Sequence, residues 1–417
     1  MGSNSLPICT RIASRDFHVQ ALGVVLPTRR KNCQPLLPLK IALIHFTAPP
    51  LNGGVERVIG EQIRILRKNG HTLSLACFEG GGAGEDVHIP LSRASSCADF
   101  VAYLSSALSG NDVIFMHNVG SLPDVPALTE ALWLLPNKIP SARWICWVHD
   151  LALTDPEHAW IHTKIEGRVF TKSCEAWEYV AVSELRAGEV EEHLGVACVV
   201  VPNGVDPGST LQLSARTASL AEAGGWWEAD AVLLHPSRLM PRKNVEAAIH
   251  LARAAREQGF DLKILLTGAE DLETVAHATY GKYLKTLAAS LRLQDAVFFL
   301  GGMMPMDSKE FCDFNLIADG LFFSGQREGF GLPVLEAGVL GRPIFCPNCE
   351  PLTRLPGAVT YPVETSAEEL ATWLIGEISE HKTIMARRQI LRDYRWPHIY
   401  LTHLVPLLQR SPLPYHS

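Results

Sequence analysis

The sequence lacks several patterns that would assign a chain at once to a broad class of protein. No run approaches 18 uncharged apolar residues, so we predict no transmembrane helix. Basic residues are in the minority, because 37 lysines and arginines face 44 acidic residues, and the formal net charge is −7. That balance argues against general nucleic-acid binding. With 47% hydrophobic and only 19% charged residues, we expect a globular protein with large cores.

The cysteines are too scattered to suggest a disulfide framework. Ten occur, and some lie inside apolar runs, such as Cys77 and Cys146, where a cysteine packs as a small apolar side chain. This usage favours a reducing compartment, and we predict a cytoplasmic protein, with peripheral membrane contact left open. Cys346 and Cys349 form a single Cys-x-x-Cys pair. Without a second pair we expect no zinc site, and we interpret the pair as a structural loop, with a redox pair as the alternative.

The length of 417 residues allows two domains of ordinary size. The stretch before residue 39 has no clear periodicity and carries five basic residues against one acidic residue, Asp16. We interpret it as a flexible extension, with a transit peptide as the alternative. We predict an extension at 1–38, domains at 39–206 and 207–390, and a C-terminal helical segment at 391–417.

Short apolar runs alternate with segments of helical periodicity along the whole chain, which predicts an α/β protein with parallel sheets. Stretches 78–90 and 207–229 fit neither pattern, so we expect a polar glycine-rich loop and a linker. The strands are predicted at 40–46, 72–78, 112–116, 143–148, 179–183, 231–235, 262–267, 297–300, 320–325 and 344–346. The main helices are predicted to begin near residues 55, 184, 245, 283, 309, 334 and 396.

Polar residues follow two strands of the first half, and a glycine pair follows another. Gly53 and Gly54 come after the first strand, at the start of a helix, but they do not form a Gly-x-Gly-x-x-Gly fingerprint. Asn118 follows the strand 112–116, and His149 with Asp150 follows the strand 143–148. Ligands of an open parallel sheet bind outside the carboxyl ends of its strands, so we expect these residues to face a ligand.

In the second half, cations and carboxylates occupy comparable places. Arg238 and Lys243 lie on a loop that ends at a helix start, where Asn244 is a suitable N-cap, and two cations there can neutralise a diphosphate. Further along, Glu328 and Glu336 lie eight positions apart, on a glycine-containing loop and the helix that follows it. Carboxylates in these positions can accept hydrogen bonds from the hydroxyl groups of a sugar and of a ribose.

These four signatures, in this order, resemble the retaining glycosyltransferases of the GT-B fold, most closely family 4. The resemblance covers roughly residues 40 to 410. It implies two Rossmann-like β/α/β domains that face each other across a deep cleft, with the last helix crossing back to the first domain. The first domain would serve the acceptor, and the second would bind a nucleotide sugar.

The resemblance also implies a role for each residue. His149, Arg238, Lys243 and Glu328 would be catalytic. Donor binding would fall to Gly53, Gly54, Gly329, Phe330, Gly331, Leu332 and Glu336, and the acceptor side to Asn118 and Asp150. The Gly301–Gly302 loop would lie against the nucleotide base.

The implied reaction is a retaining transfer of a hexose from a nucleoside-diphosphate sugar, of the UDP-glucose or GDP-mannose type, to an acceptor hydroxyl. No Asp-x-Asp occurs, so we predict that Arg238 and Lys243 take the place of a metal and that no cofactor is required. The acceptor, a sugar, a glycoside or a lipid-linked glycan, stays open, as does the base of the donor. Two alternatives remain, a sugar-nucleotide 2-epimerase with the same fold and a catalytically silent sugar-nucleotide-binding regulator.

Overall fold

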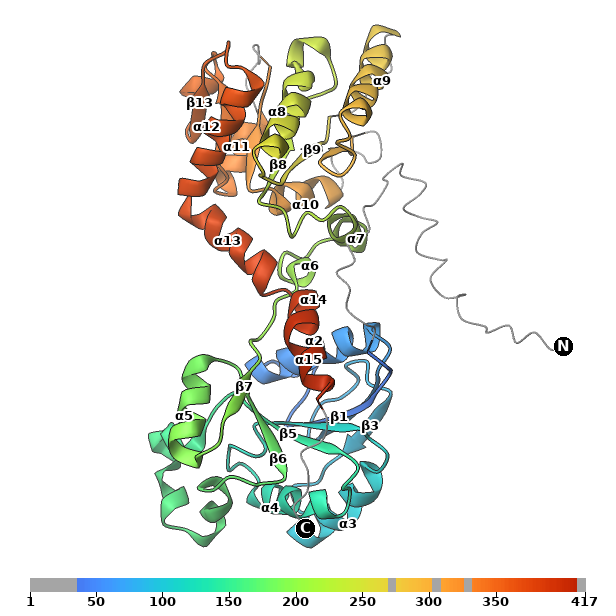
Figure 1. The fold of residues 1–417 in the computed structure, drawn as a ribbon, viewed down its shortest axis with the longest axis vertical. Helices are drawn as coiled ribbons and strands as arrows, with labels where there is room; N and C mark the ends of the chain where they lie inside the picture. The colour runs from blue at the N-terminus through green and yellow to red at the C-terminus, as the bar shows by residue number, and fades with distance from the viewer. Residues whose placement is uncertain (1–35, 269–274, 302–308, 326–331, 411–417) are drawn as a thin grey trace, which may run out of the picture. The chain divides into compact units, whose positions relative to one another are not determined.

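A computed structural model describes residues 36–268, 275–301, 309–325 and 332–410. These residues form two compact units. The N-terminal unit contains residues 36–206 together with 393–410, and the C-terminal unit contains residues 207–392. Figure 1 shows the elements of both, and each unit is described by itself.

The N-terminal unit is built on seven parallel strands in the order β3-β2-β1-β4-β5-β6-β7. The order reverses between β1 and β4, so helices can cover both faces. The strands are β1 (Lys40–Ile44), β2 (Thr72–Cys77), β3 (Val87–Pro90), β4 (Val113–His117), β5 (Arg143–Val148), β6 (Trp177–Ala181) and β7 (Cys198–Val200).

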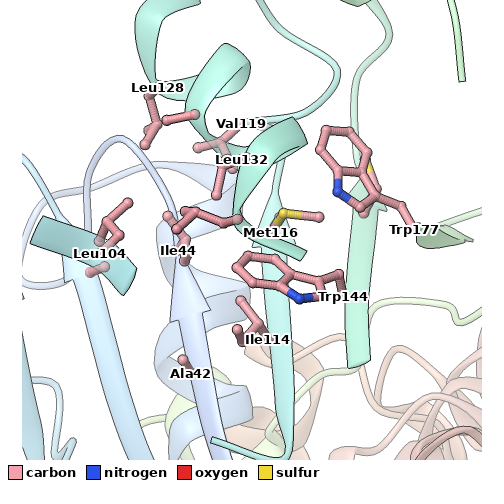
Figure 2. Packing of buried hydrophobic residues seen from close by; sticks show 14 of the residues in the cluster. Ala42, Ile44, Leu104, Ile114, Met116, Val119, Leu128, Leu132, Trp144 and Trp177 are labelled. Atoms are coloured by element: carbon pink, nitrogen blue, oxygen red, sulfur yellow. The ribbon is translucent and has the colours of Figure 1, made fainter. Parts of the chain in front are cut away.

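One face of this sheet packs on α3 (Cys97–Ala107) and α4 (Pro126–Leu134). Figure 2 shows this core, in which Leu104 and Leu132 from the two helices lie over Ile44 and Met116 of the strands, and Trp144 and Trp177 fill the β5–β6 side. The remaining helical elements of residues 135–206 are η1 (Leu135–Asn137), η2 (Ala152–Thr154), η3 (Pro156–His162), η4 (Ile165–Phe170) and α5 (Glu184–Leu194). Ser183 caps α5, because its hydroxyl accepts a hydrogen bond from the Arg186 amide.

The other face packs on α2 (Gly54–Lys68) and on the end of the chain, which includes α14 (Trp396–Ile399) and α15 (Val405–Leu408). A π-helical turn, η7 (Tyr400–Leu404), joins these two short helices. Two polar contacts hold the segment: Tyr400 Oη lies 3.0 Å from His71 Nε2, and Arg143 Nη1 donates to the Leu407 carbonyl at 3.0 Å. In Figure 1 the red α14 lies beside α2.

The C-terminal unit is built on six parallel strands in the order β10-β9-β8-β11-β12-β13, and the order reverses between β8 and β11. The strands are β8 (Ala231–His235), β9 (Leu262–Leu266), β10 (Val297–Phe299), β11 (Gly320–Phe322), β12 (Ile344–Pro347) and β13 (Ala358–Tyr361). The helical elements are α6 (Pro207–Thr210), α7 (Ala215–Ala223), η5 (Pro241–Lys243), α8 (Val245–Glu257), α9 (Val275–Ser290), α10 (Lys309–Ile317), α11 (Leu332–Val339), η6 (Leu352–Arg354), α12 (Ala367–Glu380) and α13 (Lys382–Asp393).

Two expectations from the sequence were wrong. Residues 78–90 are not entirely loop, because β3 at Val87–Pro90 pairs with β2 as an edge strand in which only Ile89 is buried. Such a strand shows little apolar alternation in its sequence. Residues 207–229 are not a plain linker either: α7 lies there, and Trp226 and Trp227 are buried in the core of the C-terminal unit.

Each unit therefore contains a doubly wound parallel sheet flanked by helices, which confirms the predicted α/β class with Rossmann-like halves. Across the described ranges, no helix is both long and apolar enough to cross a membrane.

Candidate functional site

The strand-order reversal of the N-terminal unit brings three histidines to one edge of the sheet. His45 follows β1, His117 ends β4 and His149 follows β5, and these three strands are neighbours. His45 Nδ1 lies 2.7 Å from the His117 carbonyl oxygen, and His117 Nδ1 lies 3.0 Å from His149 Nε2. The His117 side chain thus contacts the His149 side chain, and the His45 side chain contacts the main chain of His117, so the three residues form one series across the carboxyl ends of the strands.

All three histidines are buried, and burial lowers the pKa of each. For His149 the pKa falls to about 4, because burial and the neighbouring His45 outweigh the opposite effect of Asp150. The pKa of His117 is lowered well below its usual value, because this side chain is fully buried and the neighbouring His149 and His45 disfavour a further positive charge. The series is therefore uncharged near neutral pH.

Asn118 connects the β4 and β5 ends through its side chain. Its Oδ1 accepts hydrogen bonds from the amides of His149 (2.9 Å) and Asp150 (3.1 Å), and its Nδ2 donates to Asp150 Oδ2 at 3.1 Å. Asn118 has a φ of 57°, a left-handed conformation that asparagine tolerates better than most residues. Ser121 adds a hydrogen bond to the Asp150 carbonyl at 2.7 Å. The sequence-predicted Asn118, His149 and Asp150 therefore lie together.

Gly53 and Gly54 lie at the start of α2, with Gly53 at the N-cap position. The Glu56 side chain folds back over Gly53, and a Cβ on Gly53 would lie 1.8 Å from Glu56 Oε2. Thr47 donates a hydrogen bond to Glu56 Oε1. Burial alone would raise the pKa of Glu56, but hydrogen bonds from Thr47 and the main chain outweigh it and lower the pKa. The glycine loop thus carries an ionised carboxylate at the helix N-terminus.

Sequence reasoning missed His45 and Glu56 as members of this edge. The predicted strand 40–46 contained His45, whereas β1 ends at Ile44 and His45 follows it, so the wrong strand bound hid the signal that singled out His149. Glu56 showed none, because an acidic residue in the first turn of a helix is common.

In the C-terminal unit the β8 and β11 ends meet through Ser324. Its hydroxyl donates to the Lys243 carbonyl oxygen at 3.0 Å, and its oxygen lies 2.9 Å from His235 Nε2. Since the serine proton points to the carbonyl, His235 Nε2 is the donor in the second contact. Burial and the nearby Lys243 lower the pKa of His235 to about 4. Neither His235 nor Ser324 was predicted.

The loop after β8 holds the two predicted cations in different surroundings. Lys243 is only 8% exposed, whereas Arg238 is exposed. Asn244 occupies the N-cap position of α8 as predicted, but its φ is 49° and its side chain makes no capping bond. The Val245 amide instead donates to the Tyr280 hydroxyl at 3.2 Å.

The glutamate run is only partly described. Glu328, Gly329, Phe330 and Gly331 lie outside the described residues, as does Gly302. Leu332 begins α11 and is exposed, and Glu336 is exposed one turn further along that helix. The helix after the predicted loop is thus present at the expected position.

No group of three or more histidine, cysteine, aspartate and glutamate side chains suited to a metal ion occurs in the part of the chain that the structure describes. Cys346 and Cys349 form no disulfide, and Cys349 Sγ lies 3.8 Å from the Gly325 carbonyl oxygen. Burial raises the pKa of the Cys346 thiol to about 11, and Cys349 adds to the rise.

Two protein-family models match the chain. The model described as Glycosyltransferase Family 4 matches residues 52–209, and the one described as Glycosyl transferases group 1 matches residues 219–357. The first range contains β2 to β7 and the second contains β8 to β12. The chain belongs to the group 1 glycosyltransferases of the GT-B fold. A search among curated proteins found no match to it.

Solved structures give weak overall likenesses. A glycosyltransferase from Rickettsia africae ESF-5 is 17% identical, with 90% of this chain and 100% of that chain covered and a TM-score of 0.36. Anabaena HepE in complex with UDP and glucose is 17% identical, with 89% and 100% covered and a TM-score of 0.37. Sucrose-phosphate synthase from Thermosynechococcus elongatus is 16% identical, with 89% and 98% covered and a TM-score of 0.36.

Proposed function

We propose that this glycosyltransferase moves a hexose from a nucleoside-diphosphate sugar to an acceptor hydroxyl, with retention at the anomeric carbon and without a metal ion. The observation that carries the proposal is the hydrogen bond from Ser324 Oγ to the Lys243 carbonyl. It ties the cationic loop after β8 to the residues that follow β11, and the glutamate run comes next in the sequence. These ends flank the strand-order reversal, which is where doubly wound sheets bind nucleotides.

Donor binding is assigned to the C-terminal unit. Arg238 and Lys243 hold the diphosphate, Glu336 accepts hydrogen bonds from the ribose hydroxyls, and Glu328 does the same for the sugar. Gly329, Phe330, Gly331 and Leu332 are assigned to donor binding as well.

In the reaction, the bond between the anomeric carbon and the phosphate oxygen breaks as the acceptor oxygen attacks from the same face. The departing phosphate takes the proton of the acceptor hydroxyl, so no protein nucleophile is needed. Negative charge grows on the diphosphate in the transition state, and Arg238 and Lys243 stabilise it there. Lys243 is suited to this because its burial excludes water that would screen the charge.

The N-terminal unit supplies the remaining contacts in this proposal. His149 contacts the donor sugar, and Asn118 and Asp150 line the acceptor side. Gly53 and Gly54 are assigned to donor binding, because glycine lets the main chain approach a ligand closely. The family membership and the clustering of these residues at one sheet edge support the assignment.

The test is a thermal-shift panel of UDP-, GDP- and ADP-sugars on the purified full chain, with and without EDTA. A ligand that binds only the native state raises the midpoint in proportion to its occupancy. We expect one nucleotide class to raise it, and Glu336→Ala to remove the shift. Glu336 is exposed, so its replacement should leave the free protein's midpoint unchanged.

Transfer is then assayed with the selected donor and a set of sugar, glycoside and lipid-linked acceptors. Product with the same anomeric configuration as the donor supports retention. Conversion of the donor without any acceptor would instead support an epimerase. If no sugar nucleotide shifts the midpoint, the proposed donor class is wrong.

A further inference from the structure

The histidine series of the N-terminal unit has a direction that its hydrogen bonds determine. A neutral imidazole carries one proton, so one ring nitrogen donates and the other accepts. His45 Nδ1 faces a carbonyl oxygen, that of His117, at 2.7 Å. A carbonyl can only accept, so His45 carries its proton on Nδ1 and keeps a lone pair on Nε2.

For the next contact, between His117 Nδ1 and His149 Nε2, two directions are available. If His149 donated, His117 would carry its proton on Nε2. That nitrogen is buried and has no hydrogen-bond partner among residues 36–268, 275–301, 309–325 and 332–410. The His117 ring also packs against the rings of Trp147 and Phe115, with centroids 5.2 and 6.3 Å from its own. Neither ring offers it an oxygen or nitrogen acceptor.

A buried N–H without an acceptor is rarer in proteins than a buried acceptor without a donor. His117 Nε2 therefore carries a lone pair, and the ring proton of His117 is on Nδ1. His117 then donates to His149 Nε2, and His149 carries its own proton on Nδ1. Burial keeps all three rings neutral, so this arrangement is not disturbed by protonation near neutral pH.

We propose that His117 is a positioning residue that holds His149 as the Nδ1–H tautomer, so that His149 donates a hydrogen bond to a substrate oxygen and does not accept a proton from it. His149 is 8% exposed, and its Nδ1 is not among the buried polar atoms that lack a partner. This inference rests on the proposed function only for the identity of the substrate oxygen, a hydroxyl of the sugar.

The chemical consequence is a division of roles at this edge. His149 offers a donor, whereas His45 offers the lone pair of Nε2. Glu56, Asp124 and Asp150 all act on His45 as nearby negative charges. The carboxylates at this sheet edge repel an anionic ligand, whereas the neutral donor and the neutral acceptor can both bond to a hydroxyl group. The edge therefore favours an uncharged hydroxyl group over a phosphate or a carboxylate.

The first experiment determines the tautomer directly, in the absence of any substrate. Protein labelled with ¹⁵N-histidine is examined by long-range ¹H–¹⁵N correlation, and the His149 signals are assigned by their loss in His149→Gln. We expect a protonated Nδ1 and an unprotonated Nε2 for His149. A protonated Nε2 would overturn the proposal.

The second experiment uses a pair of variants at the positioning residue. His117→Asn keeps an amide donor near the place of Nδ1, whereas His117→Leu removes it. We expect His117→Leu to lose about tenfold in kcat, the effect of about one hydrogen bond, and His117→Asn to recover most of it. Unchanged thermal midpoints identify the loss as functional.

The outcomes separate this inference from the proposed function. The expected tautomer in a protein without transferase activity supports the inference while the proposed function fails. An active transferase in which His149 Nε2 is protonated, or in which His117→Leu retains full kcat, contradicts the inference alone.

Discussion

At the scale of single residues, the candidate site is built from polar side chains that the fold buries at strand ends. Lys243 is 8% exposed and follows β8 by eight positions, and His235 is fully buried at the end of that strand. Lysine side chains are seldom buried, so a buried lysine at the carboxyl ends of the strands is a candidate for function. Arg242, its immediate neighbour, is exposed and serves as the comparison.

Replacement of Lys243 by alanine should lower kcat by about a hundredfold or more, because one transition-state contact to the leaving diphosphate is worth roughly 3 kcal/mol. Steady-state kinetics with the identified donor measures the loss, and circular dichroism checks the fold. Arg242→Ala, the matched control, should retain the kcat of the parent. Equal losses in the two variants would contradict the assignment of Lys243.

The stability of the protein should fall as the pH is lowered from about 6.5 to about 4. In the native state the pKa of His235 is about 4, whereas an ordinary histidine in the unfolded chain has a pKa near 6.5. In this window the unfolded state binds a proton that the native state does not, so acid favours unfolding, by about 3 kcal/mol for this group. Denaturant unfolding at several pH values measures the slope.

His235→Gln provides the comparison for that slope. Glutamine can donate to Ser324 but does not titrate, so the variant should show a shallower decline between pH 6.5 and 4. Part of the remaining decline comes from the other buried histidines whose pKa is lowered, His45, His71, His117 and His149. A slope identical to that of the parent would show that His235 titrates normally.

At the scale of elements, the strand ends of the C-terminal unit approach one another too closely for side chains. A Cβ on Gly268, two residues after β9, would lie 1.7 Å from the Ser237 carbonyl oxygen. A Cβ on Gly301 would lie 2.0 Å from the Gly268 carbonyl oxygen. Glycine at these positions lets the β10, β9 and β8 loops stack, and the last of these loops carries Arg238.

Gly268→Ala should therefore destabilise the C-terminal unit and shift the loop of Arg238, because its Cβ meets main-chain atoms that cannot rotate away. We expect a loss of about 1–3 kcal/mol, as for other overpacked positions. Gly376→Ala, in the exposed interior of α12 with nothing within 4 Å of its Cβ, should stabilise by about 0.5–1 kcal/mol. Denaturant midpoints of the two variants should move in opposite directions.

At the scale of the whole molecule, the chain leaves the N-terminal unit near residue 206 and returns to it at residue 393. The segments at these two points contact each other. The Val205 amide donates a hydrogen bond to the Tyr394 carbonyl oxygen at 2.7 Å, and Trp396 packs against Gly204. Trp396 is 2% exposed and belongs to the core between α2 and the sheet. The stability of the first half of the chain thus depends on its last residues.

Trp396→Ala should destabilise the N-terminal unit by about 3–5 kcal/mol, the usual cost of truncating a buried tryptophan. Limited proteolysis followed by mass spectrometry should find the earliest new cuts within residues 36–206. Tyr394→Ala keeps the main-chain bond and removes a side chain that is 44% exposed, so it should have little effect. First cuts confined to residues 207–392 would contradict this view of the fold.

The strands were the most predictable part of the structure. Arg143–Val148 and Ala231–His235 were predicted with their observed bounds, because a strand buried on both faces is a continuous apolar run. Edge strands and surface helices have weaker apolar patterns in the sequence. β3 exposes three of its four residues and β13 buries one, so neither stands out in the sequence.

The sequence by itself determined the alternation of strands and helices, the glycines and prolines at their ends, and the order of the charged signatures, because each of these is a local property. Only the tertiary structure decided which polar side chains meet. The contacts from His45 to His117, His117 to His149 and Ser324 to Lys243 join residues 72, 32 and 81 positions apart. They exist because β1, β4 and β5, and likewise β8 and β11, become neighbours when the sheets form, and that order follows from packing the whole chain.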